Sequence, residues 1–128
     1  MIAVALVLAA IAALLHVFIF YLESIAWTGE RALRTFGTTP EEAAATRELA
    51  FNQGFYNLFL AVVAVVGIGL MAGGQSAAGA ALVFAGVGSM AAAALVLFAT
   101  SPEKRAAALK QGTVPLLAVI ALAVGLAL

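Results

Sequence analysis

The feature that most constrains this chain is an uncharged stretch from Leu49 to Pro102, which contains no Asp, Glu, Lys, Arg or His. A helix crosses a bilayer with about 20 apolar residues, so this stretch is too long for one crossing. It divides best at Ala72–Gly79, "AGGQSAAG", where glycines and polar residues favour a turn. The stretch therefore predicts two membrane helices joined by a short connection.

The composition extends this prediction to the whole chain. Hydrophobic residues make up 66% of the 128 residues and charged residues only 9%, whereas soluble domains carry roughly 25% charged residues. The N-terminal run "MIAVALVLAA" lacks the basic segment of a secretory signal, so we expect it to be a retained helix. We predict an all-α integral membrane four-helix bundle, formed by one domain over 1–128, with spans at about 2–27, 50–71, 77–100 and 106–128.

The basic residues predict the orientation of this bundle. Positively charged loops stay in the cytoplasm, so we expect both termini outside and both charged connections inside the cytoplasmic (inner) membrane. The zero net charge argues against a nucleic-acid partner. All six basic residues lie between spans one and two or between spans three and four: Arg31, Arg34, Arg47, Lys104, Arg105 and Lys110.

Two short motifs describe the connection between spans one and two. In "TTPEE", Thr39 is a helix cap and Pro40 takes the first helical position, so the second helix should begin near Pro40. The segment "TGERALRTFG" predicts a short interfacial helix, with Leu33 and Phe36 toward lipid and Gly37 at its end.

Two ionisable residues interrupt the first span, in "HVFIFYLESIAW". His16 and Glu23 are seven positions apart, which places them within about 20° of one helix face and about 10 Å apart along it, with Phe20 between them. Trp27 is a typical interface residue. Ionisable groups at this depth are costly and mark candidate sites. Two structural alternatives remain: Glu23 could reach the interface and pair with nearby arginines, and His16 could be a neutral hydrogen-bonding group between helices.

The second span begins with three carboxamides in "AFNQGFYNLF", namely Asn52, Gln53 and Asn57. Lipid cannot satisfy their donors and acceptors, so partners such as Glu23 and Tyr56 are expected, although a purely structural network is an equal alternative. In the fourth span, Gln111 enters at the same depth, and Lys110 is a further candidate there. Together these residues predict a pocket open to the cytosol, lined by the ligand-binding candidates His16, Phe20, Glu23, Trp27, Asn52, Gln53, Tyr56, Asn57 and Gln111. We expect no cofactor and no metal, because the chain has a single histidine and no cysteine.

Several of these motifs resemble a bacterial membrane protein family catalogued as domain of unknown function 1304. The matching segments are "HVFIFYLES.AW", "FG", "AFNQGFYNLFLA", "SP" and "QGTVP", which together span most of the chain. The resemblance implies a small four-helix membrane protein and supplies no activity.

The sequence leaves three functions open. The preferred one is binding, with transport as an extension, of a small lipophilic or amphiphilic molecule. The second is an intramembrane enzyme, in which His16 and Glu23 are the catalytic candidates for acid–base chemistry on a lipid-soluble substrate. The third is a structural or accessory subunit, and the small-residue helix faces would also permit a homodimer in the lipid bilayer.

Overall fold

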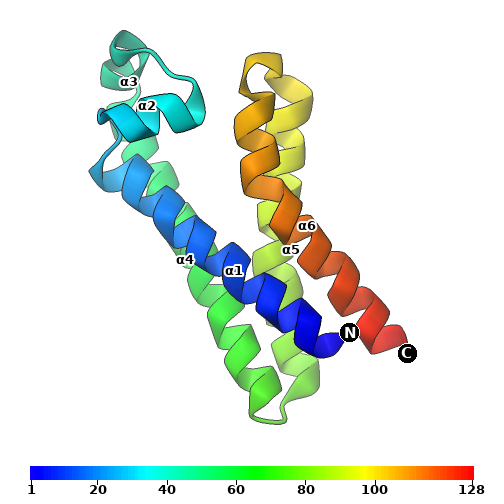
Figure 1. The fold of residues 1–128 in the computed structure, drawn as a ribbon. Coiled ribbons are helices and arrows are strands. Elements are labelled where there is room, and N and C mark those ends of the chain that lie inside the picture. Colours follow the sequence, from blue (N-terminus) through cyan, green and yellow to red (C-terminus); the bar gives the residue numbers. More distant parts are fainter.

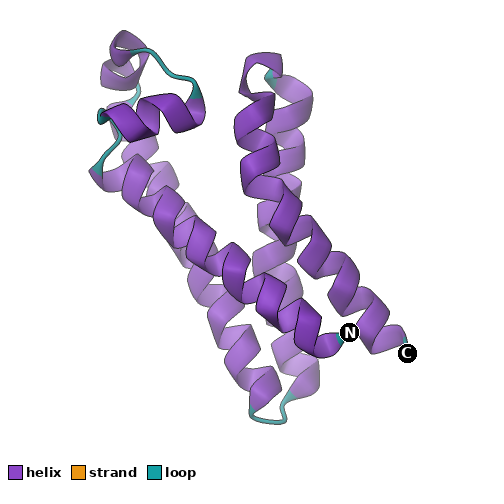
Figure 2. Ribbon diagram, in the orientation of Figure 1, coloured by secondary structure: helices purple, strands orange, loops and turns teal.

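The computed structural model describes all of residues 1–128, which form helices and no strand (Figure 2). Four helical segments are long and apolar enough to cross a membrane: Ile2–Ile25, Arg47–Ala72, Ser76–Thr100 and Pro102–Ala127. The chain is therefore an all-α membrane four-helix bundle, as predicted. Its elements are α1 (Ile2–Phe20), the π-helix η1 (Tyr21–Ile25), α2 (Glu30–Phe36), α3 (Pro40–Ala45), α4 (Arg47–Ala72), α5 (Ser76–Thr100), the 3₁₀ turn η2 (Pro102–Lys104) and α6 (Arg105–Ala127).

The four long helices form a ring in which α1 packs on α4, α4 on α5, α5 on α6 and α6 on α1. Figure 1 shows that they converge where the termini and the α4–α5 turn lie, which we call the narrow end. They separate toward the wide end, which carries α2, α3 and η2. There, α1 and α4 with their connection form a first arm, and α5, η2 and α6 form a second arm.

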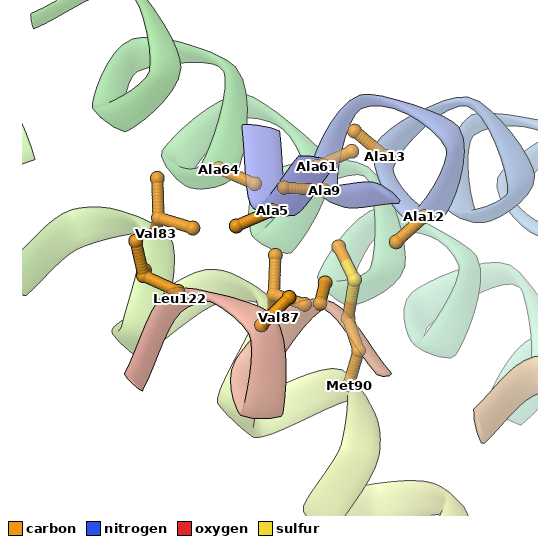
Figure 3. Close-up of a cluster of buried hydrophobic side chains, with 12 residues drawn as sticks. Ala5, Ala9, Ala12, Ala13, Ala61, Ala64, Val83, Val87, Met90 and Leu122 are labelled. Atoms are coloured by element: carbon orange, nitrogen blue, oxygen red, sulfur yellow. The ribbon is translucent and has the colours of Figure 1, made fainter. Parts of the chain in front are cut away.

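The packing of this bundle is the reverse of that in a soluble protein. Large apolar side chains such as Leu14, Val65 and Leu95 point outward, whereas most of the buried side chains are alanines. Lipid accepts an apolar exterior, and small interior residues let helix backbones approach closely. Figure 3 shows the resulting core at the narrow end, to which all four long helices contribute: Ala5, Ala9, Ala12, Ala13, Ala61, Ala64, Val83, Val87, Met90, Ala118, Ala121 and Leu122.

Glycines bring α4 and α5 into backbone contact. A Cβ atom at Gly67 would lie 2.7 Å from the backbone nitrogen of Val83, and a Cβ at Gly86 would lie 2.9 Å from that of Ala64. Real Cβ atoms do not approach backbone atoms this closely, so only glycine fits at these two positions.

The connection between the first two spans contains both expected helices. The Thr39 hydroxyl accepts from the backbone N–H of Glu42, whose carboxyl accepts in turn from the backbone N–H of Thr39, a complete capping box. Gly37 ends α2 in the left-handed conformation, with φ of 63°. However, the helix from Pro40 is not continuous, because it ends at Ala45 and α4 begins anew at Arg47.

Other expectations about local structure were wrong. Phe36 is buried against Trp27 instead of facing lipid, because α2 folds back over the end of the first span. The 3₁₀ turn η2 runs directly into α6, which begins at Arg105, so the fourth apolar segment as a whole extends from Pro102 to Ala127. The π-helix η1, closed by the bond from the Ala26 N–H to the Tyr21 carbonyl at 2.9 Å, was not foreseen.

The contact at Gly67 generates a matched pair of substitutions. We expect Gly67→Leu to destabilise the bundle by about 1–3 kcal/mol or more, because the side chain would collide with the backbone of α5. Gly69 lies two residues away in the same helix with open space beside it, so Gly69→Leu should have little effect. Unfolding in mild detergent, titrated with a denaturing detergent, measures both; equal losses would contradict the close approach.

Candidate functional site

A cavity of about 880 Å³ lies between the two arms at the wide end of the bundle. From the first arm it is lined mainly by polar residues of α1, η1, α4 and the α2–α3 connection, including His16, Glu23, Gln53 and Asn57. From the second arm, α5 supplies a largely apolar wall of Met90, Ala93, Val96 and Leu97, and η2 and α6 supply Glu103, Lys104, Ala107 and Gln111. The cavity therefore has one largely apolar wall, on α5, and polar residues on its other walls. Its size is typical of small-molecule sites.

Glu23 is held by the close packing of η1 on α4. Its carboxyl oxygen Oε1 accepts a hydrogen bond from the side-chain amide of Asn57, and only 8% of the residue is exposed. The next residue, Ser24, donates to the carbonyl of Phe51 at 2.7 Å. Gly54 makes this approach possible, because a Cβ there would overlap the Ser24 hydroxyl. The π-turn and these contacts fix the carboxyl against α4.

His16 lies deeper in the bundle and is 2% exposed. Its Nδ1 is 2.9 Å from the carbonyl oxygen of Ala12, one turn earlier. A carbonyl can only accept, so Nδ1 carries the proton of this bond. Every fully buried side-chain nitrogen or oxygen has a hydrogen-bond partner. Because Nε2 of His16 makes no bond within the protein, this nitrogen is not fully buried. It therefore keeps an opening to the cavity that His16 lines.

Trp27 connects the short helices at the wide end of the first arm. Its indole N–H lies 3.1 Å from the carbonyl of Ala43 and 3.3 Å from the hydroxyl of Thr46, at the junction of α3 and α4. Its ring also packs on Phe36 of α2, with the ring centroids 5.4 Å apart. This single side chain thus ties α2 and α3 to the end of the first span and lines the cavity as well.

Lys104 connects the two arms across the cavity. Its Nζ donates to the carbonyl of Phe36 at 2.9 Å, and it also lies 3.4 Å from the carbonyl of Gly37 and 3.3 Å from the hydroxyl of Thr38. These two carbonyls end α2, where a cation is favoured. No other side-chain hydrogen bond joins the arms, so Lys104 is the polar link at the wide end.

The structure brings together six of the nine residues predicted from the sequence. The cavity is lined by His16, Glu23, Trp27, Gln53, Asn57 and Gln111.

The other three residues lie elsewhere. Phe20 packs edge-to-face on Phe55, with centroids 5.0 Å apart, inside the first arm. Asn52 is exposed and donates to the carbonyl of Glu48 in its own helix, and Tyr56 is 65% exposed on the outside of α4. Their positions on the helix circumference turn these side chains away from Glu23. The sequence predicted their depth in the membrane but not this direction.

Sequence reasoning missed three charged residues at the cavity, Lys104, Glu42 and Glu103. It named Lys110 as a further candidate, but this residue is exposed and does not line the cavity. The signal for Lys104 was available in part. The "SP" motif at Ser101–Pro102 marks a turn, and a lysine two residues after it must lie near the end of the bundle. Its partner could not be read from the sequence, since the partner is a pair of backbone carbonyls.

A second cavity of about 550 Å³ lies on the other side of η1, between it and the start of α4. It shares Glu23 and Trp27 with the larger cavity and adds Arg47 and Glu48. It is the smaller of the two, and a larger share of its lining residues is charged.

Comparison with known protein families identifies the family of this chain. The model of the protein family of unknown function DUF1304 matches residues 10–123. The chain belongs to this family. No curated protein and no solved structure gives a match. The resemblance predicted from the sequence motifs is therefore confirmed, and the DUF1304 match includes every residue of the larger cavity.

The Lys104 link generates a prediction for this DUF1304 protein. Lys104→Met should let the arms separate, because it leaves the two α2 carbonyls without their donor, and it should lower stability by roughly 1 kcal/mol. The chain has no cysteine, so spin labels at Arg34→Cys and Ala106→Cys report the distance between α2 and α6. We expect a longer and broader distance distribution in Lys104→Met, and no change in Lys110→Met, whose lysine is exposed. Identical distributions in the two variants would show that Lys104 does not hold the arms.

Proposed function

We propose that this protein binds a small lipophilic or amphiphilic molecule in the cavity between its arms. The observation that carries the proposal is the two-sided lining, in which Glu23, Asn57 and Gln53 face the apolar wall of α5. A polar group buried in a membrane protein is costly unless it is paired or serves a site. A molecule with a polar head and an apolar body would satisfy both walls together.

The position of the cavity supports entry from the membrane surface. Its lining includes residues at the wide end that are largely exposed, among them Leu49 and Val96. The bundle core closes the opposite side with packed alanines. A ligand would therefore enter and leave at the wide end, and transport across the membrane would require the narrow end to open as well.

The intramembrane-enzyme hypothesis uses the same cavity. His16 and Glu23 both line it, and the arrangement leaves Nε2 of His16 facing the open space. Binding and acid–base chemistry thus share their residues, and only the fate of the bound molecule separates them.

Mass spectrometry of small molecules extracted from the purified protein tests the binding proposal. We expect a compound enriched in the wild type and reduced to background in Ala93→Trp, which fills the cavity from α5. Ala92→Trp is the matched control, because Ala92 is exposed and does not line the cavity; it should retain the compound. If no compound is enriched, or if both variants retain it, a structural or accessory role is favoured. Recovery of two interconvertible compounds, with one absent in His16→Phe, would favour the enzyme.

The orientation is also a proposal. All six basic residues lie in α2, in η2 or in the first two turns of α4 and α6, at the wide end of the bundle. The charge rule then assigns this end to the cytoplasmic side of a bacterial inner membrane. The ligand would then be exchanged with the cytoplasmic side.

Reporter fusions test this orientation. Alkaline phosphatase fused after Leu128 should be active, because it is exported, whereas the same enzyme fused after Thr39 should be inactive. The reverse pattern would place the cavity on the outer side.

A further inference from the structure

Two polar groups that line the larger cavity, His16 and the Glu23–Asn57 pair, offer more hydrogen-bond acceptors than donors. His16 donates its Nδ1 proton to Ala12, so a neutral imidazole presents only an acceptor, Nε2, to the cavity. This nitrogen cannot satisfy a ligand group that itself only accepts.

The Glu23–Asn57 pair has the same bias. Asn57 uses one amide hydrogen on Oε1 of Glu23. An ionised carboxyl has about four lone-pair sites and no proton, and Asn57 keeps its own carbonyl oxygen and one amide hydrogen. After this bond the pair therefore presents a surplus of acceptors.

The charges around the cavity favour a cation. Its lining contains three carboxyl groups, from Glu23, Glu42 and Glu103, and one ammonium group, from Lys104. The ammonium is already committed to the oxygens at the end of α2. Of the carboxyl groups, Glu23 lies deepest and has a single hydrogen-bond partner, so a positive donor would find an unfilled position there.

The opposite wall accepts an alkyl chain. Met90, Ala93, Val96 and Leu97 follow one another along α5, and a linear chain parallel to that helix would contact all four. A chain of this kind cannot form hydrogen bonds and would need none at this wall.

We propose that the ligand is an amphiphile with a primary ammonium head group, which donates its N–H groups at the Glu23–Asn57 pair while its alkyl chain lies against α5. The inference rests on the proposed binding function and narrows it to one chemical class. A carboxylate, a ketone or an ester head group brings no N–H or O–H group that could be donated to the free acceptors of Glu23 and His16.

Four amphiphiles with the same dodecyl chain test this inference: dodecylamine, dodecyltrimethylammonium, 1-dodecanol and dodecanoate. The chain has one tryptophan, and Trp27 lines the cavity, so its fluorescence reports binding to the wild-type protein in lipid nanodiscs. Empty nanodiscs measure how much of each amphiphile partitions into lipid. The Ala93→Trp variant is a second control, and its binding is measured by separating bound from free amphiphile. We expect dodecylamine to bind about tenfold or more tightly than each of the others, the ratio that charged hydrogen bonds supply.

The outcomes separate the inference from the function on which it rests. Equal binding of dodecyltrimethylammonium would show that charge suffices and overturn the role of the N–H donors. Equal or tighter binding of 1-dodecanol or dodecanoate would overturn the cationic class, and the binding function would stand. Absence of saturable binding by all four, together with no compound recovered from the purified protein, would remove the binding function itself.

Variants then locate the head group. Glu23→Gln keeps the shape of the side chain and an acceptor for Asn57, and it should abolish the preference for dodecylamine. Asn57→Leu should reduce the preference, whereas the control Asn52→Leu changes an exposed asparagine outside the cavity and should not. A preference that persists in Glu23→Gln would place the head group elsewhere. The comparison among amphiphiles needs only the wild-type protein, so it remains decisive if a variant fails to fold.

Discussion

Close packing of alanine and glycine faces at the narrow end is the constraint on which the rest of the structure depends. With backbones in contact at Gly67 and Gly86, α4 and α5 cannot separate there. The same is true of α1 and α6, since a Cβ at Gly125 would lie 3.0 Å from the backbone nitrogen of Ile2. Toward the wide end, larger and polar side chains occupy the interior, and the arms diverge around them. The cavity is thus the consequence of a change in side-chain size along one bundle.

The polar groups are distributed unevenly between the arms. Within the first arm, three side chains connect neighbouring elements. Ser24 of η1 donates to α4, Asn57 of α4 donates to Glu23 of η1, and Trp27 donates to α3. The second arm contributes a largely apolar face of α5, together with Glu103, Lys104 and Gln111 from η2 and α6. Hydrogen bonds in a membrane have fewer competitors than in water, so the first arm should behave as one rigid unit. Relative motion would then occur between the arms at the wide end, where Lys104 makes the side-chain hydrogen bonds that join them.

The sequence predicted the architecture well, because bilayer thickness sets the length of each span and glycine-rich segments mark the turns. It also predicted depth, and so brought His16, Glu23, Asn57 and Gln111 to one region. What it could not predict is rotation. Gln53 and Asn52 are neighbours at the same depth, yet only Gln53 lines the cavity. That choice depends on how η1 packs against Gly54, a tertiary contact with no local signature. The link from Lys104 was missed for a similar reason, since backbone carbonyls leave no mark in a sequence pattern.

The π-helix in the first span has a consequence for the whole segment. An α-helix turns by about 100° per residue, and a π-turn accommodates one extra residue within the same length. Every side chain after Phe20 is therefore out of phase, by about one residue, with the alanine face formed by Ala5, Ala9 and Ala12. The span therefore has two parts with different helical registers. In the first part the alanines face the core, and in the second part Glu23 faces Asn57. Loss of Tyr21 or Leu22 would leave a span long enough to cross the membrane, with the carboxyl of Glu23 turned away from α4.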